Sequence, residues 1–147
     1  LWDRALIEEA ELTLHRASAL NRAGRYQLEA AIQSAHASRA WRGLVDWDAI
    51  VLLYQALGEL TGSPVARLNA AAAIAKRDGP EAGYEAAEAA GAHYPVLRDY
   101  QPYWALMADL CAKLGRTQAA RAAYDEAMAR ETDGAVVAFL KQRRDNL

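Results

Sequence analysis

The chain is punctuated at nearly even intervals by residues that favour the ends of helices. Glycine, proline and short polar groups recur about 16 to 20 residues apart, which leaves room for one helix and one short turn between successive breaks. The breaks fall at residues 21–24, 42–43, 61–64, 78–80, 94–95, 115–117 and 132–134. This spacing predicts eight helices, at residues 3–20, 26–40, 46–60, 64–77, 80–92, 100–114, 117–130 and 134–146.

Local signals support three of the predicted helix starts. Asp46 precedes the third helix, where its carboxylate can accept hydrogen bonds from the free backbone N–H groups of the first turn. Ser63 stands in the same position before the fourth helix. Pro64 and Pro80 open the fourth and fifth helices, where a missing N–H costs nothing.

Composition favours helices and a packed core. Alanine, the strongest helix former, is the commonest residue, and hydrophobic residues make up 53% of the 147 positions. The single phenylalanine and the scarcity of β-branched runs argue against a large sheet. We therefore predict an all-α fold in which residues 1–147 form a single domain.

Some of the predicted helices are apolar on more than one side. The third helix carries a stripe of aliphatic residues with further apolar residues beside it: Ile50, Leu53, Leu57 and Leu60, widened by Val51 and Tyr54. A helix of this kind must pack between neighbours. A row of such helices joined by short turns predicts a right-handed helical-repeat stack.

The clearest repeat, at residues 101–132, resembles a tetratricopeptide repeat. Its two helices carry the alternation of large and small residues at Trp104, Met107, Ala108 and Cys111 and at Ala120, Tyr124 and Ala127. Small residues mark the close crossing of the helices, and large ones fill the gaps beside it. Gly115 stands in the turn, where a left-handed conformation is expected. The usual closing proline is replaced by Thr132, and the preceding unit matches only in part.

A broader resemblance covers nearly the whole chain and rests on motifs that occur in order. They are Trp2-Asp3-x-Ala5-Leu6-Ile7-x-Glu9-Ala10, Gly24-x-Tyr26-Gln27-Leu28-x-Ala30-Ala31-Ile32 with His36-Ala37, Asp46-Trp47-x-x-Ile50-x-x-Leu53-Tyr54-x-x-Leu57, Ser63-Pro64-Val65-x-x-Leu68-Asn69-x-Ala71, and Gly79-Pro80-x-Ala82-Gly83. Together they resemble the C-terminal extension of a group of bacterial extracytoplasmic-function RNA polymerase sigma factors. In that group a tetratricopeptide-like domain follows the two sigma domains.

The resemblance implies a regulatory role in transcription initiation, exerted through protein–protein contacts. The expected partners are the sigma domains of the same chain, RNA polymerase or a regulatory protein. The sequence shows neither the segment that binds core polymerase nor the helix-turn-helix that reads the promoter. The resemblance therefore implies the extension alone, as the C-terminal part of a longer protein and without sigma activity of its own. The alternative is a free-standing helical-repeat scaffold that binds peptides or partner proteins outside transcription.

No residue pattern indicates catalysis, a cofactor or a metal. His15, His36 and His93 lack the spacing of metal ligands, and His36 is expected to be a half-buried, hydrogen-bonded residue. Cys111 lies on an apolar helix face, which indicates a small core residue. A single cysteine fits a reducing compartment, so we expect a cytoplasmic protein, and no apolar run is long enough to span a membrane. We predict a binding domain rather than an enzyme.

The aromatic and basic side chains are interpreted as structural. Trp47 and Trp104, like the other aromatic residues, lack the interleaved lysine and arginine that binding to nucleic acid requires, so core packing is the favoured role. Lys141, Arg143 and Arg144 form a short basic end, which we interpret as a solvated last turn. A contact from this end to an acidic sigma or polymerase surface is the alternative.

A candidate protein-binding groove follows from the repeat. In a stack of helical hairpins, the first helix of each repeat lines one concave face. The 101–132 unit places Ala105, Asp109 and Lys113 on that face, and the preceding unit adds Asn69 and Lys76. Asn69 stands in an alanine-rich helix, where two explanations remain open. Its amide either bonds a neighbouring turn or holds the backbone of a bound peptide.

The sequence also predicts that the isolated domain forms no sequence-dependent complex with promoter DNA. Affinity for DNA arises largely from lysine and arginine that neutralise phosphates, and the formal net charge here is −2. A gel shift at physiological salt is the measurement. A tight complex that prefers promoter DNA over an unrelated duplex would contradict the prediction.

Overall fold

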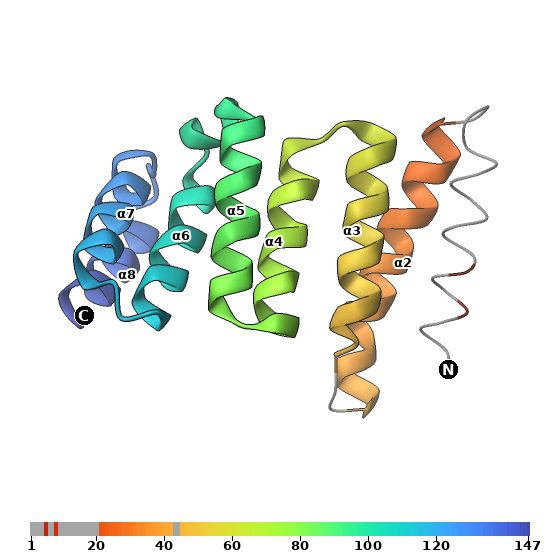
Figure 1. Ribbon diagram of the computed structural model, residues 1–147, viewed down its shortest axis with the longest axis horizontal. Coiled ribbons are helices and arrows are strands. Elements are labelled where there is room, and N and C mark those ends of the chain that lie inside the picture. The colour runs from red at the N-terminus through yellow and green to blue at the C-terminus, as the bar shows by residue number, and fades with distance from the viewer. Residues whose placement is uncertain (1–4, 6–7, 9–20, 43–44) are drawn as a thin grey trace. The chain divides into compact units, whose positions relative to one another are not determined.

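The structure, a computed structural model, describes residues 5, 8, 21–42 and 45–147. These residues are all-helical, with no strand among them (Figure 1). The elements are α2 (Asn21–Arg42), α3 (Trp47–Thr61), α4 (Pro64–Asp78), α5 (Pro80–His93), the 3-10 helix η1 (Pro95–Asp99), α6 (Gln101–Lys113), α7 (Thr117–Ala129) and α8 (Gly134–Asp145). The all-α prediction is confirmed for this part of the chain.

Seven α-helices are described rather than the eight predicted. The remaining helix, predicted at residues 3–20, lies outside the described residues, as does nearly all of the first motif, Trp2 to Ala10. The chain divides into two compact units, residues 1–73 and 74–147, with the boundary inside α4. Both units contain buried apolar residues.

In the first unit, α2 and α3 lie side by side (Figure 1). Leu28 and Ile32 of α2 and Ile50, Val51 and Leu53 of α3 are buried, with exposed fractions of 3% or less. Buried residues follow one another around α3, which confirms that this helix is apolar on more than one side. The core of this unit is therefore built mainly from aliphatic side chains.

The predicted break at residues 21–24 is wrong, because α2 is already helical from Asn21. Arginine and alanine in this stretch are good helix formers, and only Gly24 carries a cost, of about 1 kcal/mol relative to alanine. Gly24 is buried in the structure. Tertiary packing of a long helix can offset a cost of that size, so the local signal is overridden.

The predicted helix starts at α3, α4 and α5 are confirmed. The Asp46 carboxylate accepts a hydrogen bond from the Ala49 N–H at 3.1 Å, and the Ser63 hydroxyl accepts one from the Ala66 N–H at 3.3 Å. Pro64 and Pro80 are the first residues of α4 and α5. Local chemistry at these sites therefore decides where the chain turns.

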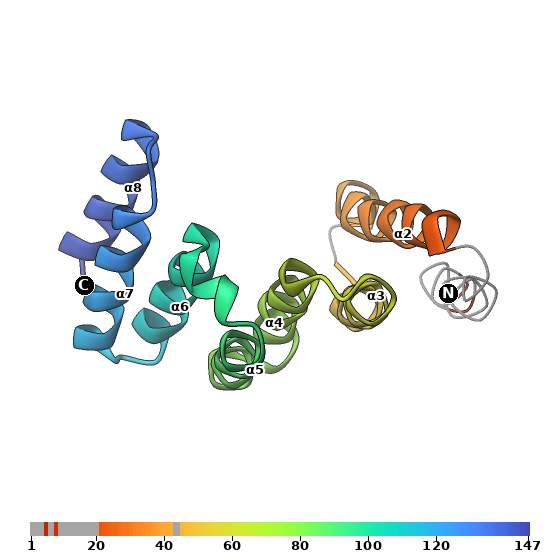
Figure 2. The same cartoon turned by 90° about the horizontal axis from the view of Figure 1, so that it is seen from above.

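In the second unit, α6 packs along α7, and α7 also contacts α8 (Figure 2). The small residues predicted at the α6–α7 crossing, Ala108, Ala120 and Ala127, each have an exposed fraction of 0%. Tyr124 is also buried, at 3%. Gly115 has a φ of 72°, which is the left-handed conformation expected for the turn. Cys111 is buried, and burial raises the pKa of its thiol, as fits a small core residue.

Trp104 is half-buried, which corrects its predicted role as a core residue. Its indole Nε1 donates a hydrogen bond to the carbonyl oxygen of Arg98 at 2.8 Å, and the Arg130 guanidinium lies 5.4 Å from the ring centroid. The indole therefore joins η1, an element that the sequence did not predict, to α6 and the end of α7. An aromatic ring that carries an N–H donor is suited to such a position at the edge of a core.

The α4–α5 hairpin depends on a glycine at a close backbone approach. A Cβ atom on Gly83 would lie 2.3 Å from the Cβ of Ala75 and 2.8 Å from its Cα. We expect Gly83→Ala to destabilise the protein by about 1–3 kcal/mol in thermal or urea unfolding, because the backbones must move apart. Gly134→Ala is the matched control, since a Cβ there meets nothing within 4 Å and the free energy of unfolding should be unchanged or slightly raised. Equal stability of the two variants would contradict this packing.

Burial also predicts a difference between the two large aromatic residues of the 101–132 unit. Tyr124→Ala should lower the free energy of unfolding by about 3–5 kcal/mol, because the ring is lost from a closed core. Trp104→Ala should cost less, about 1–3 kcal/mol, because its ring is half-exposed. Urea unfolding of both variants measures the difference. A larger loss of unfolding free energy for Trp104→Ala would show that the hydrogen bond to Arg98 contributes more to stability than the burial of the ring.

Candidate functional site

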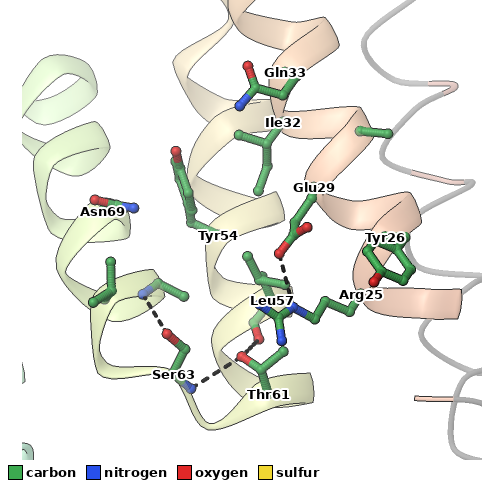
Figure 3. A pocket seen from close by; sticks show the side chains of 13 residues that line it. Arg25, Tyr26, Glu29, Ile32, Gln33, Tyr54, Leu57, Thr61, Ser63 and Asn69 are labelled. Carbon is green, nitrogen blue, oxygen red and sulfur yellow. Dashed lines mark hydrogen bonds and ion pairs between the residues drawn. The ribbon is translucent and has the colours of Figure 1, made fainter. Parts of the chain in front are cut away.

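The first unit contains a pocket of about 810 Å³ between α2, α3 and the beginning of α4 (Figure 3). The described residues that line it are Arg25, Tyr26, Glu29, Ala30, Ile32 and Gln33 of α2, Tyr54, Leu57 and Thr61 of α3, Ser63 before α4, and Val65, Ala66 and Asn69 of α4. A volume of this size lies within the range of sites that hold small ligands or short peptide segments.

The base of the pocket is formed by the turn between α3 and α4, whose two hydroxyl oxygens accept hydrogen bonds from backbone N–H groups. Thr61 Oγ1 donates to the Leu57 carbonyl oxygen at 2.7 Å and accepts from the Ser63 N–H at 3.2 Å. Ser63 Oγ accepts from the first turn of α4. These bonds fix the turn, and through it the direction in which α4 leaves α3 (Figure 3).

The charged side chains of the pocket neutralise each other. Arg25 Nε lies 3.0 Å from Glu29 Oε1, one helical turn further along α2, and both side chains are exposed. Among the described residues that line the pocket, these two are the only ones with a full charge at neutral pH. The pocket therefore carries no net charge from its described walls.

Three polar side chains from three different helices lie around the pocket. Gln33 projects from α2, Tyr54 from α3 and Asn69 from α4 (Figure 3). Within the described chain, none of these three side chains makes a hydrogen bond. Tyr54 and Asn69 are half-buried, and burial raises the pKa of the Tyr54 hydroxyl, so it stays protonated at neutral pH. Gln33, Tyr54 and Asn69 thus offer two carboxamides and one phenol with free donors and acceptors, and of the three Gln33 is exposed.

Apolar residues form the rest of the lining. Ile32 and Ala66 have exposed fractions of 3%, and Leu57 of 9%, so they close the inner wall. Val65 and Tyr26 are more accessible, at 37% and 61%. The pocket therefore combines an apolar wall with unpaired neutral polar groups.

The residues predicted to form a groove fall in both units. Asn69 belongs to the first, while Lys76, Ala105, Asp109 and Lys113 belong to the second. Asn69 does line a pocket, and among the described residues its side chain makes no hydrogen bond to a neighbouring turn. Asn69 and Lys113 therefore belong to different units, and the structure does not assign them to one site.

In the second unit, Asp109 is the centre of an ion-pair group. Its carboxylate lies 2.8 Å from Lys113 Nζ and 3.2 Å from Arg143 Nη2. Ala105 is half-buried on the same helix, and Lys76 is exposed at the end of α4. The sequence predicted Asp109 and Lys113 as groove residues but did not foresee that they pair with each other and with α8.

The remaining motif residues have varied positions. His36 is exposed rather than half-buried, and its ring meets the half-buried Trp47 edge-on, with centroids 6.2 Å apart. Nothing in the pair indicates a ligand site, and the described residues contain no cluster of side chains able to hold a metal ion. No helix of the described part is both long and apolar enough to cross a lipid bilayer.

Gln33, Arg25 and Glu29 are pocket residues that the sequence analysis missed. They follow one another at intervals of four along α2 and so share one helix face. Tyr26 had been identified as part of a motif, and it lies on the same side. The periodicity was therefore visible in the sequence, but its meaning depended on which face of α2 meets α3.

Over its full length of 147 residues the chain is 40% identical to an uncharacterized protein of Rhizobium meliloti (strain 1021). The chain spans 34% of that protein's length. No protein-family model matches the chain, and no solved structure matches it. The chain is therefore similar to about a third of a longer bacterial protein.

Proposed function

We propose that this chain is a regulatory domain of an alternative RNA polymerase sigma factor, acting in transcription initiation through protein–protein contacts in the cytoplasm. The observation that carries the proposal is that three of the motifs on which the resemblance to a sigma-factor extension rests supply the walls of one pocket. Tyr26 and Ile32 come from the second motif, Tyr54 and Leu57 from the third, and Asn69 from the fourth. Motifs recognised for their order along the chain thus converge on one place.

The chemistry of the pocket supports binding rather than catalysis. Among the described lining residues, the one acid and the one base are joined in an exposed ion pair, and the other polar groups carry no charge at physiological pH. Neutral amides and a phenol can hold a polypeptide by hydrogen bonds. Such groups supply neither a nucleophile nor a tuned general base.

The 101–132 unit supports the helical-repeat part of the proposal. The α6–α7 pair has alanines with 0% exposure where the tetratricopeptide pattern requires small residues. Its turn is made by a left-handed glycine, Gly115. We propose that this hairpin is one repeat of a tetratricopeptide-like stack that presents binding surfaces to the sigma domains, the polymerase or a regulatory protein.

The similarity to a longer bacterial protein supports an extension. The chain matches 34% of its uncharacterized relative, so that relative has about two thirds of its length outside the shared segment. A free-standing scaffold is the second candidate function. The pocket favours it equally, because an uncharged site for a peptide has no need of a transcription complex.

Transcription from purified components tests the proposal. The full-length parent protein is assayed with RNA polymerase on its promoter, as wild type and as the double variant Asn69→Ala, Lys113→Glu. We expect promoter-directed transcript to change by about fivefold or more, the effect of roughly 1 kcal/mol at a protein contact. The melting temperature should remain close to wild type, because the Asn69 side chain makes no hydrogen bond within the described part of the chain and the Lys113–Asp109 pair is a surface ion pair.

Gln142→Ala serves as the control, since Gln142 is an exposed residue of α8 outside the pocket and the Asp109 group. Its transcript level should equal that of wild type. A parent protein without polymerase-dependent activity would remove the sigma-factor proposal and leave the scaffold. Unchanged transcription from the folded double variant would remove these residues from the mechanism.

A further inference from the structure

Burial does little to hold α8 in the second unit. Of the residues of α8, all of which the structure describes, Leu140 alone is buried, while its neighbour Phe139 is 57% exposed. By comparison, α7 buries the ring of Tyr124 together with three alanines. Hydrophobic stabilisation follows the apolar area that is removed from water. Apolar contacts therefore contribute less to the position of α8 than to that of α7.

The sequence of α8 also favours a helix only weakly. Gly134 is its first residue, and Val136, Val137 and Phe139 follow, all of which have a lower helix propensity than alanine. A helix of 12 residues is marginal in water when no tertiary contact supports it. We therefore expect α8 to lose its helical structure whenever its contacts with the neighbouring helices open.

Two arginines in the last turn of α8 join it to both neighbouring helices. Arg143 Nη2 lies 3.2 Å from Asp109 Oδ1 on α6, and Arg144 Nη1 is paired with Asp125 on α7. Exposed ion pairs are individually weak and are screened by salt. Because α8 has little apolar burial, contacts of this size are sufficient to decide whether it is docked or released.

We propose that α8 is a releasable element, which the Arg143–Asp109 and Arg144–Asp125 pairs keep docked and which opens as one unit while α6 and α7 remain folded. This inference goes beyond the proposed function and does not depend on it. Release changes the charge of the surface that α8 leaves. Asp125 loses the arginine of α8, and Asp109 keeps only Lys113 of its two cationic partners. The docked surface is therefore largely neutralised, whereas the released surface is acidic.

The α6–α7 pair has its own means of staying folded when α8 opens. The two helices pack along each other, and Ala108, Ala120 and Ala127 in this pair have an exposed fraction of 0%. The turn between the helices is made by Gly115 in its left-handed conformation, without a contribution from α8. Proteins commonly open in such units, and the units with the fewest buried apolar contacts open most easily.

Amide hydrogen exchange of the chain, followed by nuclear magnetic resonance, tests the release of α8. At about 0.1 M sodium chloride, the backbone amides of residues 138–145 should exchange about tenfold or more faster than the slowest amides of α6 and α7. At about 1 M salt, exchange in α8 should become a further threefold or so faster, because both arginine pairs are screened. The slowest amides of α6 and α7 should be unaffected.

Substitutions assign the docking to the ion pairs. Arg144→Gln should speed exchange in α8 about threefold, because the pair with Asp125 is lost. Lys141→Gln is the matched control, since it removes an exposed charge of α8 that makes no ion pair within the described chain, and exchange should be unchanged. Asp125→Arg should also speed exchange in α8. Combining Asp125→Arg with Arg144→Asp should bring the rate back towards wild type, because the exchanged charges can pair again.

Three results would overturn the proposal. Exchange in α8 as slow as in α6 and α7 would show that the three helices open together as one cooperative unit. Fast exchange in α8 that responds neither to salt nor to Arg144→Gln would show that the ion pairs do not control docking. Faster exchange throughout α6 and α7 in the Arg144→Gln variant would show that α8 is an integral part of the core.

Discussion

Close contact between helices at glycine and alanine is the constraint on which the described structure depends most. Gly83 lets α5 approach α4 so closely that a Cβ would lie 2.3 Å from that of Ala75. Ala108, Ala120 and Ala127 have 0% exposure in the unit that contains α6 and α7. Small side chains add little apolar area, so larger residues between these crossings must supply most of the hydrophobic stabilisation. Tyr124 and Leu110 have that role in the second unit, and Ile50 and Leu53 in the first.

Polar contacts at the margins of the helix–helix interfaces fix how the helices are aligned. Small residues alone would allow one helix to shift along another. Arg116 holds both carboxylate oxygens of Glu81 at 3.0 Å, and its guanidinium lies 4.9 Å from the centroid of the Tyr84 ring. Arg143 joins α8 to Asp109 of α6 in the same unit. Exposed pairs of this kind contribute little free energy, but they favour one register among several. They also mean that Arg143 of the basic C-terminal end is engaged within the domain.

The pocket of the first unit shows the opposite behaviour. At the helix starts, by comparison, the polar side chains of Asp46 and Ser63 have partners within the fold. Gln33, Tyr54 and Asn69 surround a cavity and make no hydrogen bond within the described chain. The donors and acceptors of such side chains are available to a partner, because no hydrogen bond inside the protein must be broken first.

Sequence alone determined the helical class and most of the turns, because both depend on contacts within a few residues. Asp46, Ser63, Pro80 and Gly115 act on their own neighbours, and the structure places each as predicted. The continuation of α2 through Gly24 and the half-exposed position of Trp104 were decided by tertiary packing, which outweighs a local preference of about 1 kcal/mol. The candidate site divides in the same way. Asn69 could be identified from the sequence because it is a polar residue in an alanine-rich helix. The convergence of Gln33, Tyr54 and Asn69 on one pocket depends on how α2, α3 and α4 pack, which no local pattern specifies.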